Sequence, residues 1–261
     1  MIRGIRVELL KLRTVRASYG LLAAAVGLTA VFSIIESERA GTNNMPPLST
    51  AAGVNNIITG GVWSLMFAAA LGATLASGEF RHATATGTYL VTPNRSRVLA
   101  AKAIAAVIAG SVFGLFGWAT STAIGLGFVA ADGYANPIGA GTLARYAAGH
   151  VVAAALLSAI GAALGSLIRA QLPVVIGIFV WSIVIESILG DLFNGLQPYL
   201  PYTAASTLAG TALGSAAFGP AHSAGTTASP LPFAAAAALL AAIALAVSVI
   251  AARTTVRRDI S

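Results

Sequence analysis

The chain contains no cysteine and very little charge. The absence of cysteine excludes disulfides, thiol catalysis and metal sites built from cysteine. Charged residues make up 9% and hydrophobic residues 57% of the 261 residues, whereas a soluble domain carries about 25% charged residues. A large globular core does not explain so low a charge. The composition therefore predicts an integral membrane protein.

Motifs of common enzymes are also missing. The sequence has no G-x-S-x-G, no H-E-x-x-H and no P-loop G-x-x-x-x-G-K-[ST], and its only lysines, Lys11 and Lys102, do not follow a glycine. Its three histidines, His82, His150 and His222, fall in separate segments, and we expect no metal site from them. We predict that the chain is not an enzyme, does not hydrolyse ATP by itself and binds no cofactor of its own.

Long apolar stretches dominate what is present. Each can cross a hydrocarbon layer of about 30 Å, which needs about 20 helical residues, although the fifth is short. In lipid, a helix is the only structure in which a single segment can hydrogen-bond its own backbone N–H and C=O groups. We therefore predict an all-α polytopic membrane protein with six transmembrane helices. It would form a single transmembrane domain over residues 1–261. The expected spans are residues 18–36, 57–77, 103–131, 144–168, 173–189 and 232–252.

The cations are distributed unevenly between the two sides of this arrangement. Of the 15 Lys and Arg residues, all but Arg39 and Arg145 lie in segments on one side. The positive-inside rule therefore places both termini in the cytoplasm and predicts a multi-pass protein of the cell membrane. The net charge of +7 is accordingly a topology signal, and we expect no nucleic-acid partner.

Three connecting segments have a character of their own. Residues 2–16 predict an amphipathic helix at the membrane surface, with its cations near anionic headgroups; a helical stop signal is the alternative. Residues 78–102 form the largest expected cytoplasmic loop. Residues 190–231 are too long and too apolar for a simple connector, and a seventh crossing would break the charge rule. We predict that this outer segment enters the membrane part-way and returns before the sixth helix.

One ionisable side chain falls well inside an expected span. Glu186 lies about one turn from the outer end of the fifth helix, where burial of a carboxylate is costly unless it meets water or a partner. Two interpretations remain open at this point. Glu186 either lines a substrate path or gate, or reaches the outer interface as Asp191 does.

Three segments resemble the membrane-spanning permease subunits of ABC transporters of the type-2 exporter family, especially the small actinobacterial type. Glu8 begins E-L-L-K-L-R, similar to the E-x-x-K-L-R start of such permeases. Residues 78–102 resemble the family's loop G-E-[YF]-R-x-G-T followed by L-x-x-P-x-R and L-x-A-K, with Ala83 in place of the usual glycine. Residues 181–186 and 200–205 are similar to the family's intramembrane Glu and later L-P.

The resemblance implies a function and a set of site residues. It implies a transport path or gate between the second and fifth helices, with Phe67, Trp181 and Glu186, and an N-terminal interfacial helix with Glu8, Lys11 and Arg13. It also implies re-entrant helices over residues 191–217 and a cytoplasmic coupling helix over residues 79–97. The coupling residues carried over are Glu79, Phe80, Arg81, His82, Thr84, Pro93, Arg95 and Arg97.

The implied partners are two copies of a separate ATPase subunit, which bind ATP and Mg, a second permease copy, identical or different, and membrane lipid. The expected function is export of a hydrophobic or amphipathic solute, such as a drug or lipid, powered by that ATPase. A membrane scaffold or immunity-type protein without transport is the alternative from another class.

Overall fold

A computed structural model describes residues 2–42, 45–81, 95–168, 170–193, 195–210 and 229–257, and these ranges contain helices and no strand. The elements in chain order are α1 (Ile2–Thr14), α2 (Arg16–Arg39), α3 (Ala51–Thr59), η1 (Gly60–Val62), α4 (Trp63–Arg81), α6 (Arg95–Ala131), α7 (Ala140–Ile168), α8 (Gln171–Val180), η2 (Trp181–Ile185), α9 (Glu186–Leu192), η3 (Gln197–Tyr199), α10 (Pro201–Leu208) and α11 (Phe233–Arg257).

Six helical stretches in the described part of the chain are long and apolar enough to cross a membrane. They confirm the predicted all-α polytopic class. The second stretch joins α3, η1 and α4, and the fifth joins α8, η2 and α9. The stretches are Arg16–Arg39, Ala51–Gly78, Arg97–Ala131, Ala140–Ile168, Gln171–Leu192 and Phe233–Thr254.

Most helices extend beyond the apolar cores read from the sequence. α3 begins at Ala51, ahead of the expected start of the second span at residue 57, and the Thr50 hydroxyl oxygen accepts the Gly53 N–H at 3.2 Å as its N-cap. α6 begins at Arg95, inside the expected loop 78–102. Hydropathy marks where the hydrocarbon layer ends, whereas a helix continues into the polar region until its backbone finds other partners.

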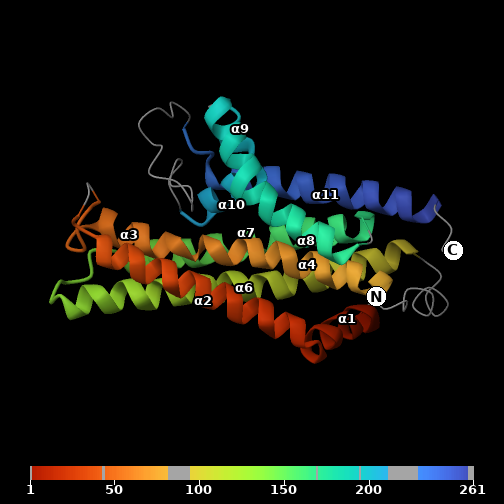
Figure 1. Ribbon diagram of the computed structural model, residues 1–261, viewed down its shortest axis with the longest axis horizontal. Helices are drawn as coiled ribbons and strands as arrows, with labels where there is room; N and C mark the ends of the chain where they lie inside the picture. The colour runs from red at the N-terminus through yellow and green to blue at the C-terminus, as the bar shows by residue number, and fades with distance from the viewer. Residues whose placement is uncertain are drawn as a thin grey trace.

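The bundle is built around the second span. α4 packs most extensively against α7 and also against α6, whereas the fifth span and α11 leave most of their surface outside the packed core (Figure 1). Gly161 of α7 lies directly against the Ala69 carbonyl of α4, and Gly110 of α6 lies against Ala154 and Ser158. These small residues let the backbones approach closely, as is typical of membrane helices.

The amphipathic helix α1 packs against the bundle as well as carrying an exposed face. Leu9 and Leu12 contact a buried cluster that includes Leu75 and Ala105, while residues on the opposite face are exposed. α11 ends at the same end of the bundle at which α1 begins (Figure 1). We refer to it as the termini end.

Candidate functional site

The fifth span changes its winding immediately before Glu186. Residues Trp181–Ile185 form a π-helical turn between α8 and α9. In such a turn, side chains five residues apart come to lie near each other, and the Trp181 Nε1–H donates a hydrogen bond of 2.8 Å to Glu186 Oε1. Short π segments of this kind are frequent at functional sites. The turn therefore joins the two residues of this helix that the sequence had singled out.

The Glu186 carboxylate caps the N-terminus of α10. Its Oε1 accepts the Tyr202 N–H at 2.8 Å, and its Oε2 accepts the Thr203 N–H at 2.9 Å and the Thr203 hydroxyl at 3.0 Å. Pro201 opens the helix and has no N–H, so the carboxylate bonds the next two free donors. A negative charge at this position also interacts favourably with the positive, N-terminal end of the helix dipole.

Glu186 is buried in this structure. The residue is only 4% exposed, so the protein itself covers the carboxylate. Four hydrogen bonds satisfy its two oxygens from within the protein. Burial of a carboxylate among apolar helices is tolerated only with such partners. The geometry makes Glu186 the group that attaches α10 to the fifth span.

A cavity of about 400 Å³ lies beside this attachment point. Its walls come from α4, α7, the fifth span and α11, and the first residues of α10 also line it. Its lining is almost entirely apolar. The residues that line it are Met66, Ala69, Leu157, Ile160, Gly161, Leu164, Ile168, Pro173, Val174, Gly177, Ile178, Trp181, Ser182, Glu186, Pro201, Tyr202, Ile243 and Val247.

The third residue expected on the path has a different position. Phe67 of α4 packs edge-to-face on Phe179 of α8, with ring centroids 5.2 Å apart, and does not belong to the cavity lining. The aromatic pair joins the second and fifth spans beside the cavity. Trp181 and Glu186 therefore meet at the cavity, and Phe67 contributes to the contact next to it.

A buried ion pair links α1 to the beginning of α6. Lys102 Nζ lies 3.2 Å from both Glu8 oxygens, and Lys11 Nζ lies 2.9 Å from Oε1. The side chains of Lys102 and Glu8 are 4% and 5% exposed. Breaking such a pair leaves a buried charge without compensation. The pair therefore fixes the position of α1 against α6.

The sequence contained a signal for Glu8, although its partner was missed. Glu8 lies three residues after Ile5 and four before Leu12, which places a carboxylate on the apolar face of α1. A charge on a face that packs needs a cation in the packed surface. Lys102 was read only as the end of a loop motif, and the structure brings it to Glu8.

The other residues of the expected coupling segment are only partly described. Glu79, Phe80 and Arg81 form the last turn of α4, and Arg95 and Arg97 belong to the first turn of α6, with Arg97 exposed. His82, Thr84 and Pro93 lie outside the described residues. In the N-terminal helix, Arg13 is exposed and its carbonyl accepts the Tyr19 hydroxyl at 2.9 Å.

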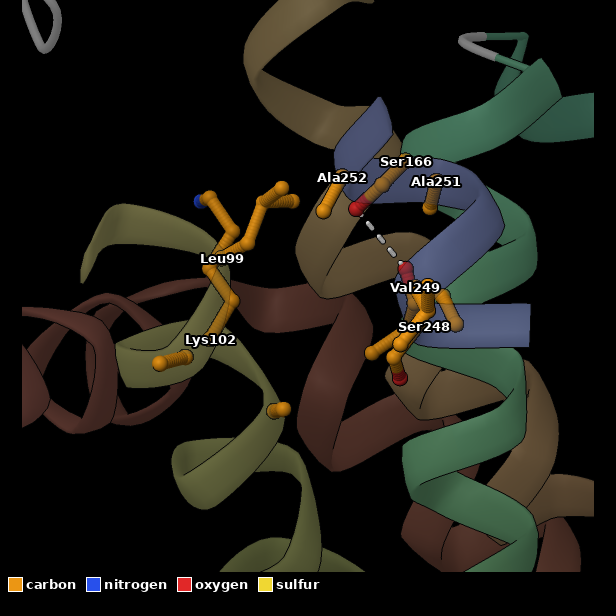
Figure 2. Close-up of a pocket in the computed structure, with 11 residues that line it drawn as sticks. Leu99, Lys102, Ser166, Ser248, Val249, Ala251 and Ala252 are labelled. Carbon is orange, nitrogen blue, oxygen red and sulfur yellow. Dashed lines mark hydrogen bonds between the residues drawn. The ribbon is translucent and has the colours of Figure 1, made fainter. Parts of the chain in front are cut away.

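A smaller pocket of about 190 Å³ lies at the termini end, between α6, α7 and α11 (Figure 2). Leu99 and Lys102 line it from α6, and Ser248 and Val249 line it from α11. Ser166 of α7 also lines it, and its hydroxyl donates to the Ala162 carbonyl at 2.9 Å. The buried end of Lys102 thus lies between this pocket and α1.

Neither the models of known protein families nor the curated proteins include a match to this chain.

Proposed function

We propose that this chain is the permease subunit of an ATP-driven ABC exporter that moves a hydrophobic or amphipathic solute across the cell membrane. The observation that carries the proposal is the apolar cavity among the second, fourth, fifth and sixth spans, which has Trp181 and Glu186 in its lining. Its apolar walls suit a solute that leaves water or lipid for a protein interior. Glu186 and Trp181 line one end of the proposed path, and Phe67 packs beside it.

The proposed topology has both termini in the cytoplasm. The start of α1 and the end of α11 lie at one end of the bundle (Figure 1). The excess of Lys and Arg in the segments expected on one side of the membrane favours a cytoplasmic position for that end. In this orientation, the exposed Val7 and Leu10 of α1 face the inner surface of the membrane. α10 is the first limb of the outer re-entrant segment, since it is packed among α4, α7 and α11 and held by Glu186.

Coupling to the ATPase involves the segment between α4 and α6. Residues 79–97 contact the partner, which binds ATP and Mg, and two ATPase copies serve a pair of permease subunits. The buried pair between Glu8 and Lys102 makes α1 and the start of α6 move together when that segment is displaced. Displacement of this segment would thereby move the two helices that flank it, α4 and α6, and also α1 at the membrane surface.

Affinity purification of the full chain from its native membrane tests the proposal. We expect an ATP-hydrolysing subunit with a P-loop to copurify in a one-to-one ratio. Glu79→Ala and Arg81→Ala should weaken that association or separate hydrolysis from transport, because charges at a docking surface fix its register. Arg257→Ala, in the last turn of α11, is the matched control and should change neither property.

Two results would contradict the proposal. Recovery of a stable complex without any nucleotide-binding subunit would favour the scaffold or immunity-type alternative. Normal association and transport in both loop variants, together with failure of Arg257→Ala, would remove the coupling role from residues 79–97.

A further inference from the structure

We propose that α3 is a hinged segment that moves about the turn η1, and that α10 locks it in place through the Tyr202 hydroxyl. α3 is the part of the second span remote from the termini end (Figure 1). The proposed motion belongs to this chain by itself and needs neither an ATPase nor transport. Four observations lead to it: the winding of the second span, the division of its packing, the polar groups at the turn and the attachment of α10.

The second span changes its winding close to its outer end. α3 ends at Thr59, Gly60–Val62 form a 3₁₀ turn, and α4 begins at Trp63. A short 3₁₀ stretch inside a helix often marks a hinge. Glycine occupies two of the three positions of the turn, and glycine leaves the backbone the most conformational freedom. The turn is therefore the point at which this span bends most readily.

The packing of the span also divides at this turn. Val54, Ile57 and Ile58 of α3 belong to a small buried cluster that includes Val129 of α6. Val62 and the buried residues of α4 that follow it belong instead to the main core. Lipid chains are as apolar as the side chains of the small cluster, so the hydrophobic effect does not drive such helix contacts in a bilayer. The position of α3 therefore depends strongly on its polar contacts.

Hydroxyl groups from other helices bond the carbonyls at this turn. The Ser121 hydroxyl of α6 donates to the Ile58 carbonyl at 2.7 Å, but it also lies 3.1 Å from two carbonyls of its own helix. The Tyr202 hydroxyl of α10 donates to the Val62 carbonyl at 3.0 Å. A phenol has a single hydrogen to donate. The Tyr202 bond therefore ties the turn to α10.

Two buried polar atoms that face the turn have no hydrogen-bond partner among the described residues. They are His150 Nε2 and Ser33 Oγ. A Cβ built on Gly61 would lie 2.7 Å from this Nε2, and one built on Gly60 would lie 3.4 Å from this Oγ. His150 Nδ1 bonds the Tyr146 carbonyl at 2.9 Å, which leaves Nε2 of the neutral ring as an acceptor. Since a buried acceptor without a partner is costly, a rewound turn that directs an N–H to Nε2 would offset part of the energy of leaving the locked position.

α10 is attached to other helices as well as to the second span. At its start, the Tyr202 N–H donates to Glu186 of the fifth span at 2.8 Å. At its end, the Leu208 carbonyl lies directly against Gly149 of α7. Tyr202 thus joins the fifth span through its backbone and the second span through its side chain. It also lines the cavity beside Glu186, so the lock lies in the wall of the proposed transport path.

Cysteine labelling of the full chain in lipid vesicles tests the lock, because the chain has no cysteine of its own. Val54→Cys places a thiol in α3, and Ser77→Cys places one near the opposite end of the span; both positions are fully buried. Tyr202→Phe removes only the hydroxyl that bonds the turn. We expect this variant to raise the N-ethylmaleimide labelling rate at position 54 about two- to tenfold, the factor that corresponds to one hydrogen bond, and to leave the rate at position 77 unchanged.

Tyr199→Phe is the matched control. It also deletes a tyrosine hydroxyl, from the 54% exposed residue that precedes α10 by two positions, and it should leave both labelling rates at the parent values. Equal rates at position 54 in Tyr202→Phe and Tyr199→Phe would overturn the lock. A rise at position 77 as large as the rise at position 54 would overturn the hinge, because the whole span would then have loosened.

Glu186→Gln provides a second perturbation, which leaves Tyr202 in place and replaces the first if Tyr202→Phe does not fold. Loosening of α10 should also raise the labelling rate at position 54, since the lock acts through α10. The double variant should label at the rate of Tyr202→Phe alone, because the lock is already absent there. An unchanged rate in Glu186→Gln, or effects that multiply in the double variant, would overturn the role of α10.

The lock and the proposed function can fail separately. Copurification of an ATPase together with an unchanged rate at position 54 in Tyr202→Phe would overturn the lock and leave the proposed function intact. The expected rise at position 54, in a chain that recovers no ATPase, would support the lock and contradict the proposed function.

Discussion

Replacement of Glu186 by glutamine should loosen α10 from the fifth span. Each carboxylate oxygen accepts two hydrogen bonds, Oε1 from Trp181 and Tyr202 and Oε2 from Thr203 alone. Glutamine keeps one oxygen and turns an NH₂ group, which cannot accept, toward the other two donors. The Thr203 hydroxyl can rotate and accept, but the backbone N–H beside it is fixed. One buried N–H therefore loses its partner.

The magnitude follows from this single loss. A buried donor left without a partner costs about 1 to 3 kcal/mol, and loss of the negative charge at the start of α10 adds about 0.3 to 1 kcal/mol. Since each 1.4 kcal/mol corresponds to a factor of about ten, the undocked population of α10 should rise about eight- to seven-hundredfold. Glu186→Ala removes all four hydrogen bonds and should have the larger effect.

The absence of cysteine makes this population measurable. Ala204 of α10 is fully buried, so a cysteine placed there is the only thiol in the protein and reacts only when α10 leaves its position. The maleimide labelling rate should rise in Glu186→Gln by the factor above. Asp191→Asn, an amide replacement on the exposed side of α9, is the matched control and should leave the rate unchanged.

A labelling rate in Glu186→Gln equal to that of the parent would refute the anchoring role. Transport, in a complex with the ATPase, should also fall in this variant. Unchanged labelling with lost transport would instead assign Glu186 to the transport path without a role in holding α10.

The remaining predictions concern the ion pair, the helix contacts and the topology. Glu8→Gln should lower stability by about 3 to 5 kcal/mol in SDS-induced unfolding, because Lys102 stays buried; Glu8→Leu combined with Lys102→Met should recover most of it, and equal losses in both would contradict the pairing. Gly161→Ala should destabilise by about 1 to 3 kcal/mol in the same unfolding assay, since its Cβ meets the carbonyl of α4, whereas Gly177→Ala should not. A single cysteine at Thr42 should react with an impermeant reagent from outside intact cells, and reaction only after permeabilisation would reverse the topology.

The spans could be predicted because lipid imposes one simple requirement on each of them. A run of about 20 apolar residues must be helical in a bilayer, and that information is local in the sequence. The short fifth run, 173–189, still predicted a span, and the helix reaches from Gln171 to Leu192 because its ends lie beyond the apolar part. Helix ends were predicted less well for the same reason.

The site could be predicted only as a set of isolated residues. A carboxylate in an apolar run indicated that Glu186 needs partners. Two of its four donors are backbone N–H groups, of residues 202 and 203, and a sequence does not show which backbone groups a side chain will meet. The π-helical turn that aligns Trp181 with Glu186 has no sequence signature either. The cavity depends on how the fifth span packs relative to α4, α7 and α11, which is not encoded in any one segment.

The ion pair of Glu8 illustrates a different limit. Its two residues are separated by 94 positions, and each had a sufficient local explanation: a charged residue in an amphipathic helix, and a lysine at the end of a loop. Only the position of Glu8 on the apolar face conflicted with that explanation. Such conflicts between a residue and its face are the places where a long-range partner can be sought.

The burial of the second span has a consequence for biosynthesis. This span is 83% buried in its apolar window, and the surface that covers α4 most extensively belongs to α7, which is made later. Translation proceeds at about 5 to 20 residues per second, so the second span waits several seconds in the membrane before residues 140–168 emerge. During that interval, the surface of the second span that α7 will later cover faces lipid or an insertion factor. Replacements that weaken the packing of α7 against α4 should therefore first reduce the yield of inserted protein, before any defect appears in the assembled molecule.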